Sequence, residues 1–220
     1  MKKREYIDRI RTVQSAAIED EIQQLYERAG EARHGMRNTL VLNWLEMTGL
    51  AASLSRIVLT DIPSFEEIEA HKQNEKAFVV FVTGIGGVKR NAAVGPRLME
   101  MTREYIDFER GLIVLRYRDV QGWREPEEVF LSSRGTAISY KAFGNLITEI
   151  FRKAKFPKAL RGTLRARFLV SCFNNFLDQQ DAVGPINYDL LLLKVAAATG
   201  HQDSESLRPY LEPALRERRR

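Results

Sequence analysis

The chain has 220 residues, of which 44% are hydrophobic and 29% are charged, and its net charge is +5. This length and hydrophobic content allow one sizeable core or at most two small domains, and they exclude global disorder. No apolar run reaches the roughly 20 residues that span a bilayer. The single cysteine, Cys172, excludes an internal disulfide and a cysteine-rich metal site.

The basic residues are concentrated in a few places along the chain. They cluster at Lys89 and Arg90, within residues 152–167, and in the tail 216–220, and the sequence pI is about 9.4. This distribution favours a nucleic-acid partner, although a solvated basic surface stays open as the alternative. The first residues, MKKREYIDRI, lack the apolar core of a signal peptide, so we expect a cytoplasmic protein that associates with DNA.

The spacing of apolar residues predicts a mainly α-helical chain with a small antiparallel β-sheet placed early, an α+β fold. Gly49 ends the second predicted helix, and Pro96 opens the helix that follows the sheet. The strand pattern predicts a β-hairpin around the glycine-rich turn at 84–87. In chain order we expect helices at 5–28, 37–47 and 51–60, strands at 76–83 and 90–94, a helix at 96–109, β-prone pieces at 112–117 and 128–131, helices at 139–155, 163–177 and 189–198, and a short helical turn at 204–211. Pro209 and Pro213 are expected to interrupt regular helix there, so that Tyr210 lies on a short, adjustable segment.

The predicted helix at 163–177 combines an apolar stripe with an arginine near its start. Arg165 lies beside this stripe, in the expected first turn, where the helix dipole attracts phosphate. A guanidinium also binds two phosphate oxygens in a fixed fork. The stripe consists of Leu164, Phe168, Leu169, Cys172, Phe173, Phe176 and Leu177, so Cys172 is interpreted as a core residue.

The most informative pattern lies near the C-terminus. Gly200 and His201 stand before a polar, turn-prone run that ends at Tyr210, nine residues after the histidine, and Arg165 lies 36 residues before the histidine. An arginine, a Gly-His pair and a tyrosine in this order and spacing resemble the C-terminal half of the tyrosine recombinases, the phage integrase family. The predicted order of elements resembles the family's catalytic domain over nearly the whole chain.

The resemblance implies a site-specific recombinase or integrase that cuts and rejoins DNA through a 3′-phosphotyrosine, without metal or other cofactor. Tyr210 would be the nucleophile, and Arg165 and His201 would bind the scissile phosphate. Lys89, near the hairpin tip, would replace the family's general-acid lysine. We expect the neighbouring arginines to contact DNA: Arg90, Arg161, Arg167 and Arg208.

The sequence also departs from the family's motifs. After Thr48-Gly49-Leu50, Ala51 stands in place of the family's first catalytic arginine, and Leu54 in place of its acidic neighbour. Gly162 replaces the histidine three residues before Arg165, and Ile85 replaces the hairpin lysine. Losing one cation at a phosphoryl transition state costs on the order of 3 kcal/mol. The candidates to replace it are Lys89, Arg167, Arg37 and Arg56.

Three functional hypotheses therefore remain. The first is an active but divergent recombinase, the second a catalytically impaired DNA-binding relative, and the third a helical protein-interaction module. We expect residues 1–220 to form a single catalytic-type domain with a basic tail at 212–220, double-stranded DNA as the partner, and self-association on DNA. We expect the family's N-terminal clamp domain to be absent, and therefore a truncated form or a partner that supplies it.

Overall fold

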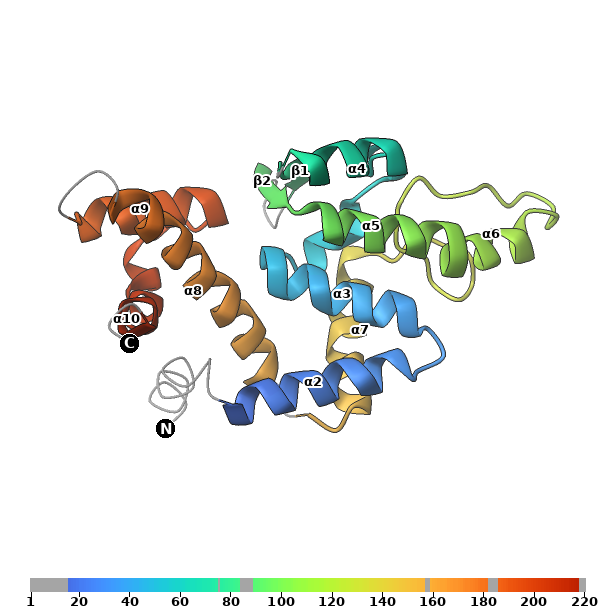
Figure 1. Ribbon diagram of the computed structural model, residues 1–220. Helices are drawn as coiled ribbons and strands as arrows, with labels where there is room; N and C mark the ends of the chain where they lie inside the picture. Colours follow the sequence, from blue (N-terminus) through green and yellow to red (C-terminus); the bar gives the residue numbers. More distant parts are fainter. Residues whose placement is uncertain (1–15, 75, 84–88, 157–158, 182–185, 218–220) are drawn as a thin grey trace. The chain divides into compact units, whose positions relative to one another are not determined.

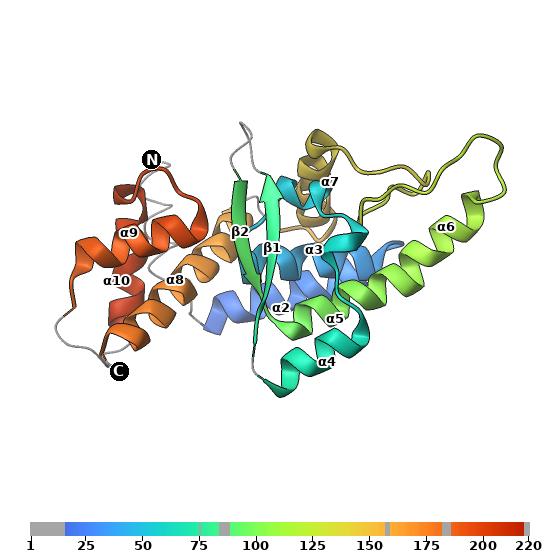
Figure 2. The same cartoon turned by 90° about the horizontal axis from the view of Figure 1, so that it is seen from above.

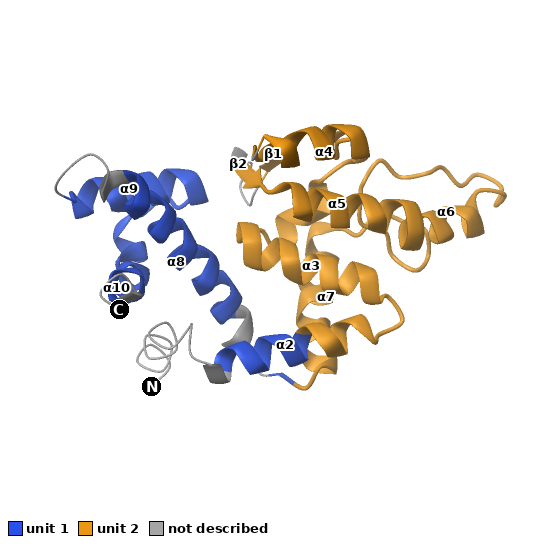
Figure 3. Ribbon diagram, in the orientation of Figure 1, with its two compact units in different colours: residues 1–25, 156–220 blue, residues 26–155 orange. Residues whose placement is uncertain are grey.

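The computed structural model describes residues 16–74, 76–83, 89–156, 159–181 and 186–217. Within these ranges no side chain is described for residues 16–17, 89–90, 159–161, 180–181 and 217. The chain divides into two compact units, one made of residues 1–25 and 156–220 and the other of residues 26–155 (Figure 3). Helix α2 (Ala16–Gly30) begins in the first unit and ends in the second.

The unit of residues 26–155 is built on helix α3 (Gly35–Thr48), which is buried along most of its length. Trp44 is fully buried, and its indole N–H donates to the hydroxyl of Thr102 in helix α5 (Pro96–Tyr105) at 3.0 Å. Helix α3 ends where Gly49 adopts a left-handed conformation (φ 64°), and its N–H bonds to Leu45. The predicted helix at 37–47 and its glycine stop are therefore confirmed.

The predicted β-hairpin is confirmed as an antiparallel pair, β1 (Phe78–Thr83) and β2 (Lys89–Val94), which Figure 2 shows side by side. Val80 and Val82 face the core, while Val79 and Phe81 on the opposite face are exposed. This alternation follows from the period of two along a strand. The turn between the strands, which includes Ile85, lies outside the described residues.

Three predictions for this unit were wrong. The segment 112–117 is not a strand. Helix α5 (Pro96–Tyr105) continues through a π-helical segment (Ile106–Arg110) into α6 (Gly111–Tyr117), as Figure 1 shows. No proline interrupts this run, so the helix continues despite its β-branched residues. The expected helix at 51–60 is two short 3₁₀ turns, Ala52–Arg56 (η1) and Leu59–Asp61 (η2). The segment 128–131 forms only isolated bridges.

Two more helices complete this unit. Helix α4 (Phe65–Gln73) was not predicted, although Ser64 and Glu67 form a capping box at its start. Helix α7 (Tyr140–Lys153) confirms the expectation for 139–155, and Ser139 caps its start with a hydroxyl that accepts from the N–H of Ala142.

The unit of residues 1–25 and 156–220, called the C-terminal unit below, is helical in its described part. It contains α8 (Ala159–Asp181), α9 (Tyr188–Thr199), a 3₁₀ turn at Glu205–Leu207 (η5), and α10 (Arg208–Glu217). The predicted stripe of α8 forms the centre of its core, where Leu169, Phe173 and Leu177 are buried. Among the described segments of both units, no helix is long and apolar enough to cross a membrane.

Candidate functional site

The end of helix α9 fixes the position of His201. Gly200 adopts a left-handed conformation (φ 70°, ψ 29°), which turns the chain back over the helix end. The N–H groups of Gly200 and His201 both bond to the carbonyl of Ala196, the latter at 2.9 Å. These two bonds satisfy a helix-end carbonyl and hold the backbone of His201 in place.

The imidazole of His201 contacts residues on two helices. Its Nε2 lies 2.9 Å from Nη2 of Arg165 on α8, and its Nδ1 lies 2.6 Å from the hydroxyl of Thr199 at the end of α9. The two predicted phosphate-binding residues, 36 positions apart in the chain, are therefore in direct contact. The sequence analysis did not single out Thr199, and its only signal is a hydroxyl residue directly before the Gly-His pair.

Arg165 is exposed on α8, between the buried residues Leu164 and Ala166. The expectation that it lies in the first turn of its helix was wrong, because α8 begins at Ala159, six residues earlier. The field of the helix dipole falls off within the first turn, so the helix end adds little at Arg165. Its capacity to bind an anion thus depends on its own guanidinium and on His201.

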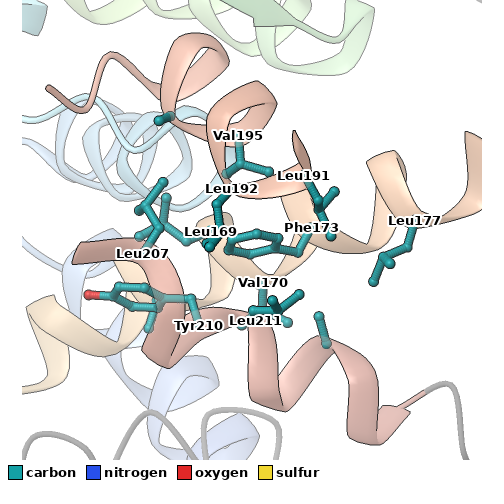
Figure 4. Close-up of a cluster of buried hydrophobic side chains, with 13 residues drawn as sticks. Leu169, Val170, Phe173, Leu177, Leu191, Leu192, Val195, Leu207, Tyr210 and Leu211 are labelled. Carbon is teal, nitrogen blue, oxygen red and sulfur yellow. The ribbon is translucent and has the colours of Figure 1, made fainter. Parts of the chain in front are cut away.

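Tyr210 belongs to the hydrophobic core of the C-terminal unit and is 7% exposed. Figure 4 shows its ring against this cluster, with the phenol oxygen pointing away from Phe173 and Leu192. The expected short, proline-interrupted turn was wrong, because α10 includes both Pro209 and Pro213. Pro209 fits there since the first turn of a helix needs no N–H donor. Tyr210 is therefore held by a regular helix whose inner face is buried.

The arginines predicted to contact DNA differ in their surroundings. Arg167 of α8 forms an ion pair with Glu19 of α2. Arg208 donates two hydrogen bonds of 2.8 Å to Glu205 and lies 3.6 Å from Asp189. The hydrogen bond to Glu205 raises the pKa of Arg208, and the same bond lowers the pKa of Glu205. The side chains of Lys89, Arg90 and Arg161 lie outside those that the structure describes.

The positions that depart from the family's motifs also have defined surroundings. In the unit of residues 26–155, Ala51 directly precedes η1, and Leu54 is fully buried within that turn. Arg37 is 7% exposed, and its Nη1 donates to the carbonyl of Leu131 at 3.1 Å. Arg37 is therefore part of the unit's core, and this burial lowers the pKa of its guanidinium.

Three further features concern Arg56, Gly162 and potential metal ligands. The guanidinium of Arg56 lies over the ring of Tyr140, 5.8 Å from its centre, which is a cation–π contact. Gly162 is half-buried in α8. Within the described residues, no group of three or more His, Cys, Asp and Glu side chains could hold a metal ion.

Replacing Gly200 with alanine is expected to destabilise the C-terminal unit. A left-handed conformation costs a residue with a Cβ roughly 1–2 kcal/mol, and φ at Gly200 is 70°. Gly144→Ala in α7 is the matched control, because nothing lies within 4 Å of an added Cβ there. That helical substitution should stabilise by about 0.5–1 kcal/mol. Urea unfolding curves of the two variants check this, and equal shifts would contradict the role of the Gly200 turn.

Comparisons with known proteins identify the fold. No protein-family model and no curated protein matches the chain. A crystal structure of XerA recombinase matches with a TM-score of 0.58 at 18% identity, covering 91% of this chain and 62% of the recombinase. XerH site-specific recombinase bound to palindromic difH substrate in a post-cleavage complex matches with a TM-score of 0.56 at 16% identity, covering 90% of this chain and 49% of XerH.

A pre-cleavage complex of XerH with difH substrate matches less closely, with a TM-score of 0.51 at 16% identity, over 87% of this chain and 48% of that one. The chain thus spans between 48% and 62% of the length of these recombinases. The predicted fold class, mainly helical with a small antiparallel sheet, is confirmed. This chain therefore has a fold similar to that of Xer recombinases and resembles the catalytic domain of tyrosine recombinases.

Proposed function

We propose that this chain is a divergent tyrosine recombinase that cuts and rejoins DNA through a 3′-phosphotyrosine intermediate. The observation that carries the proposal is the 2.9 Å contact between Arg165 and His201, with Tyr210 nine residues further on in the same unit. The recombinase fold adds support, since XerH site-specific recombinase was crystallised with difH substrate in pre-cleavage and post-cleavage complexes. The DNA would be the chromosome or a mobile element in the cytoplasm.

The proposed reaction is an exchange of two phosphate esters. The phenol oxygen of Tyr210 attacks a backbone phosphorus and forms the phosphotyrosine, while the 5′-oxygen leaves and takes up a proton. The phenol gives up its own proton, because the phenolate is the stronger nucleophile. Arg165 would bind two non-bridging oxygens and stabilise the charge that grows on them. Lys89 remains our candidate for the proton donor to the leaving oxygen.

Binding a phosphate requires the contact between Arg165 and His201 to open. Nη2 of Arg165 and Nε2 of His201 contact each other, and these are the same nitrogens that would bind an anion. An anionic acceptor forms a stronger hydrogen bond with a guanidinium than a neutral imidazole nitrogen does. A DNA phosphate would therefore replace this contact, which orients both side chains until DNA arrives.

A second candidate is a DNA-binding relative that has lost strand cleavage. Ala51 and Gly162 remove two polar groups of the family's motifs, and Tyr210 is only 7% exposed. Such a protein would bind duplex DNA through its basic residues without forming a covalent bond. Both candidates act on double-stranded DNA, and both are compatible with self-association on DNA or with a partner that supplies a clamp domain.

A covalent adduct separates the two candidates. DNA duplexes that bind the protein would first be selected from a random-sequence pool. These duplexes would then be nicked at different positions by limited nuclease digestion and incubated with the protein. A nick close to the cleaved bond leaves only a short fragment with the free 5′-hydroxyl, and this fragment diffuses away. The phosphotyrosine then accumulates because the cleaved strand cannot be rejoined. The recombinase proposal expects a protein–DNA band in denaturing gels. Binding without any such band supports the DNA-binding relative.

DNA affinity is expected to fall steeply with rising salt, because counterions are released from each neutralised phosphate. With about six phosphate contacts, the slope of log K against log salt concentration should be about −5. Fluorescence anisotropy at several salt concentrations measures it. A flat response would reject both DNA-binding candidates and leave a protein-interaction module, the third hypothesis.

A further inference from the structure

The hydroxyl of Thr199 has two neighbours that determine where its hydrogen lies. Thr199 is 2% exposed, and its Oγ1 lies 2.6 Å from the carbonyl oxygen of Val195 and 2.6 Å from Nδ1 of His201. A carbonyl oxygen only accepts, and two oxygens this close need a hydrogen between them. Since a hydroxyl has a single hydrogen, Thr199 donates to Val195 and accepts from Nδ1 of His201.

The second ring nitrogen has the opposite role. A guanidinium has donors and no acceptor, so Nη2 of Arg165 donates across the 2.9 Å contact and Nε2 of His201 accepts. His201 therefore carries its proton on Nδ1 in this structure and is neutral. Two separate hydrogen bonds, one at each nitrogen, select this tautomer.

We propose that Thr199 is a positioning residue that keeps a proton on Nδ1 of His201, so that His201 donates to a DNA phosphate only as an imidazolium. This inference rests on the proposed function. A phosphate oxygen is an acceptor, so Nε2 needs a proton when the phosphate replaces Arg165. Because Thr199 retains the proton on Nδ1, the second one comes from solvent, and phosphate binding takes up one proton.

The consequence is an additional positive charge at the phosphate. A neutral Nε2–H tautomer would donate the same hydrogen bond without a charge. The imidazolium instead places a second cation at the phosphate, besides the guanidinium of Arg165. This charge compensates in part for the cation that Ala51 removes from the family's set. The carboxylates that follow His201 in the chain have partners of their own: Asp203 accepts from the N–H of Glu205, and Glu205 accepts from Arg208.

The tautomer is measurable without DNA. Long-range ¹H–¹⁵N correlation spectra distinguish the two neutral tautomers, and the chain has only three histidines to assign. The Arg165→Met variant removes the donor to Nε2, so the effect of the Thr199 contact on the tautomer is measured without that donor. We expect His201 to be the Nδ1–H tautomer in the Arg165→Met variant. The same tautomer is expected in the double variant Arg165→Met with Thr199→Ser, because serine keeps the hydroxyl. Adding Thr199→Val instead should shift His201 to mainly Nε2–H. A mainly Nε2–H signal in Arg165→Met itself would overturn the proposal.

The activity test compares pH profiles of adduct formation on nicked DNA. Titration of Tyr210 is common to all variants, so it cancels in the ratio of wild-type to Thr199→Val rates. Imidazole loses its charge between about pH 5 and 8, so this ratio should fall about tenfold from pH 6 to pH 8. The Thr199→Ser rate should follow the wild type. A ratio that is constant with pH contradicts the proposal. If no variant forms an adduct, the recombinase proposal fails, and the spectra alone decide the role of Thr199.

Discussion

Replacing Tyr210 with phenylalanine is expected to abolish the covalent adduct on nicked DNA and to leave DNA affinity nearly unchanged. The phenol oxygen forms the phosphotyrosine bond, and no other atom of the residue replaces it. The ring itself is part of the core of the C-terminal unit, where Tyr210 is 7% exposed. Phenylalanine keeps that packing, so stability should change by no more than about 1.5 kcal/mol.

Tyr188→Phe is the matched control, since Tyr188 is 44% exposed at the start of α9 in the same unit. It should form the adduct as the wild type does. Denaturing gels measure the adduct, and anisotropy measures the affinity. An adduct that persists in Tyr210→Phe would place the nucleophile elsewhere, and a large loss of affinity would show that the substitution disturbs the fold.

Replacing Arg165 with lysine is expected to slow adduct formation by about 10²- to 10³-fold, the usual cost of losing one preorganised donor to a developing oxyanion. Lysine keeps the charge but cannot bind two oxygens in the planar fork of a guanidinium. Arg165 is exposed, so its replacement leaves the core of α8 intact. The expected loss is therefore in rate and not in stability.

Arg216→Lys provides the control for Arg165→Lys. Arg216 is an exposed residue of α10 that bonds to Glu212. Its replacement preserves charge and should leave the rate within about twofold, in line with the small contribution of surface ion pairs. Single-turnover rates at saturating protein make this comparison. Equal rates for Arg165→Lys and wild type would mean that Arg165 does not bind the reacting phosphate.

The sequence predicted most of the helices because their signals are local. Gly49 and Gly200 both adopt left-handed conformations at helix ends, and Ser139 caps the start of α7. The β-branched and aromatic residues at 76–83 predicted strand β1. In each case the deciding interaction lies within four or five residues. Because residues 79–82 are all apolar, the sequence did not show that Val80 and Val82 are buried while the other two are exposed.

The errors arose where a local signal was ambiguous. The residues of α6 are β-prone, yet the helix of α5 continues into them. The prolines at 209 and 213 predicted an interrupted turn, but Leu211 and Ala214 bury one face of α10 and favour a helix. Packing against the core thus outweighed the local preference in α10.

The candidate site could be predicted in part. The spacing from Arg165 to His201 and Tyr210 is visible in the sequence, whereas the hydrogen bond between Arg165 and His201 depends on the packing of α8 against α9. Thr199 had no signal beyond its position before Gly200, because its role follows from a side-chain contact.

The central claim is that the phenol oxygen of Tyr210 attacks DNA, and peptide mapping of the adduct tests it most directly. The protein–DNA band from nicked duplexes would be digested with trypsin and nuclease, and the peptide that carries a nucleotide would be sequenced by mass spectrometry. Trypsin does not cleave before proline, so Tyr210 should lie in the peptide that begins after Lys194 and ends at Arg216. The account predicts a nucleotide attached at Tyr210. A nucleotide on any other residue, or DNA binding with no modified peptide, would contradict it.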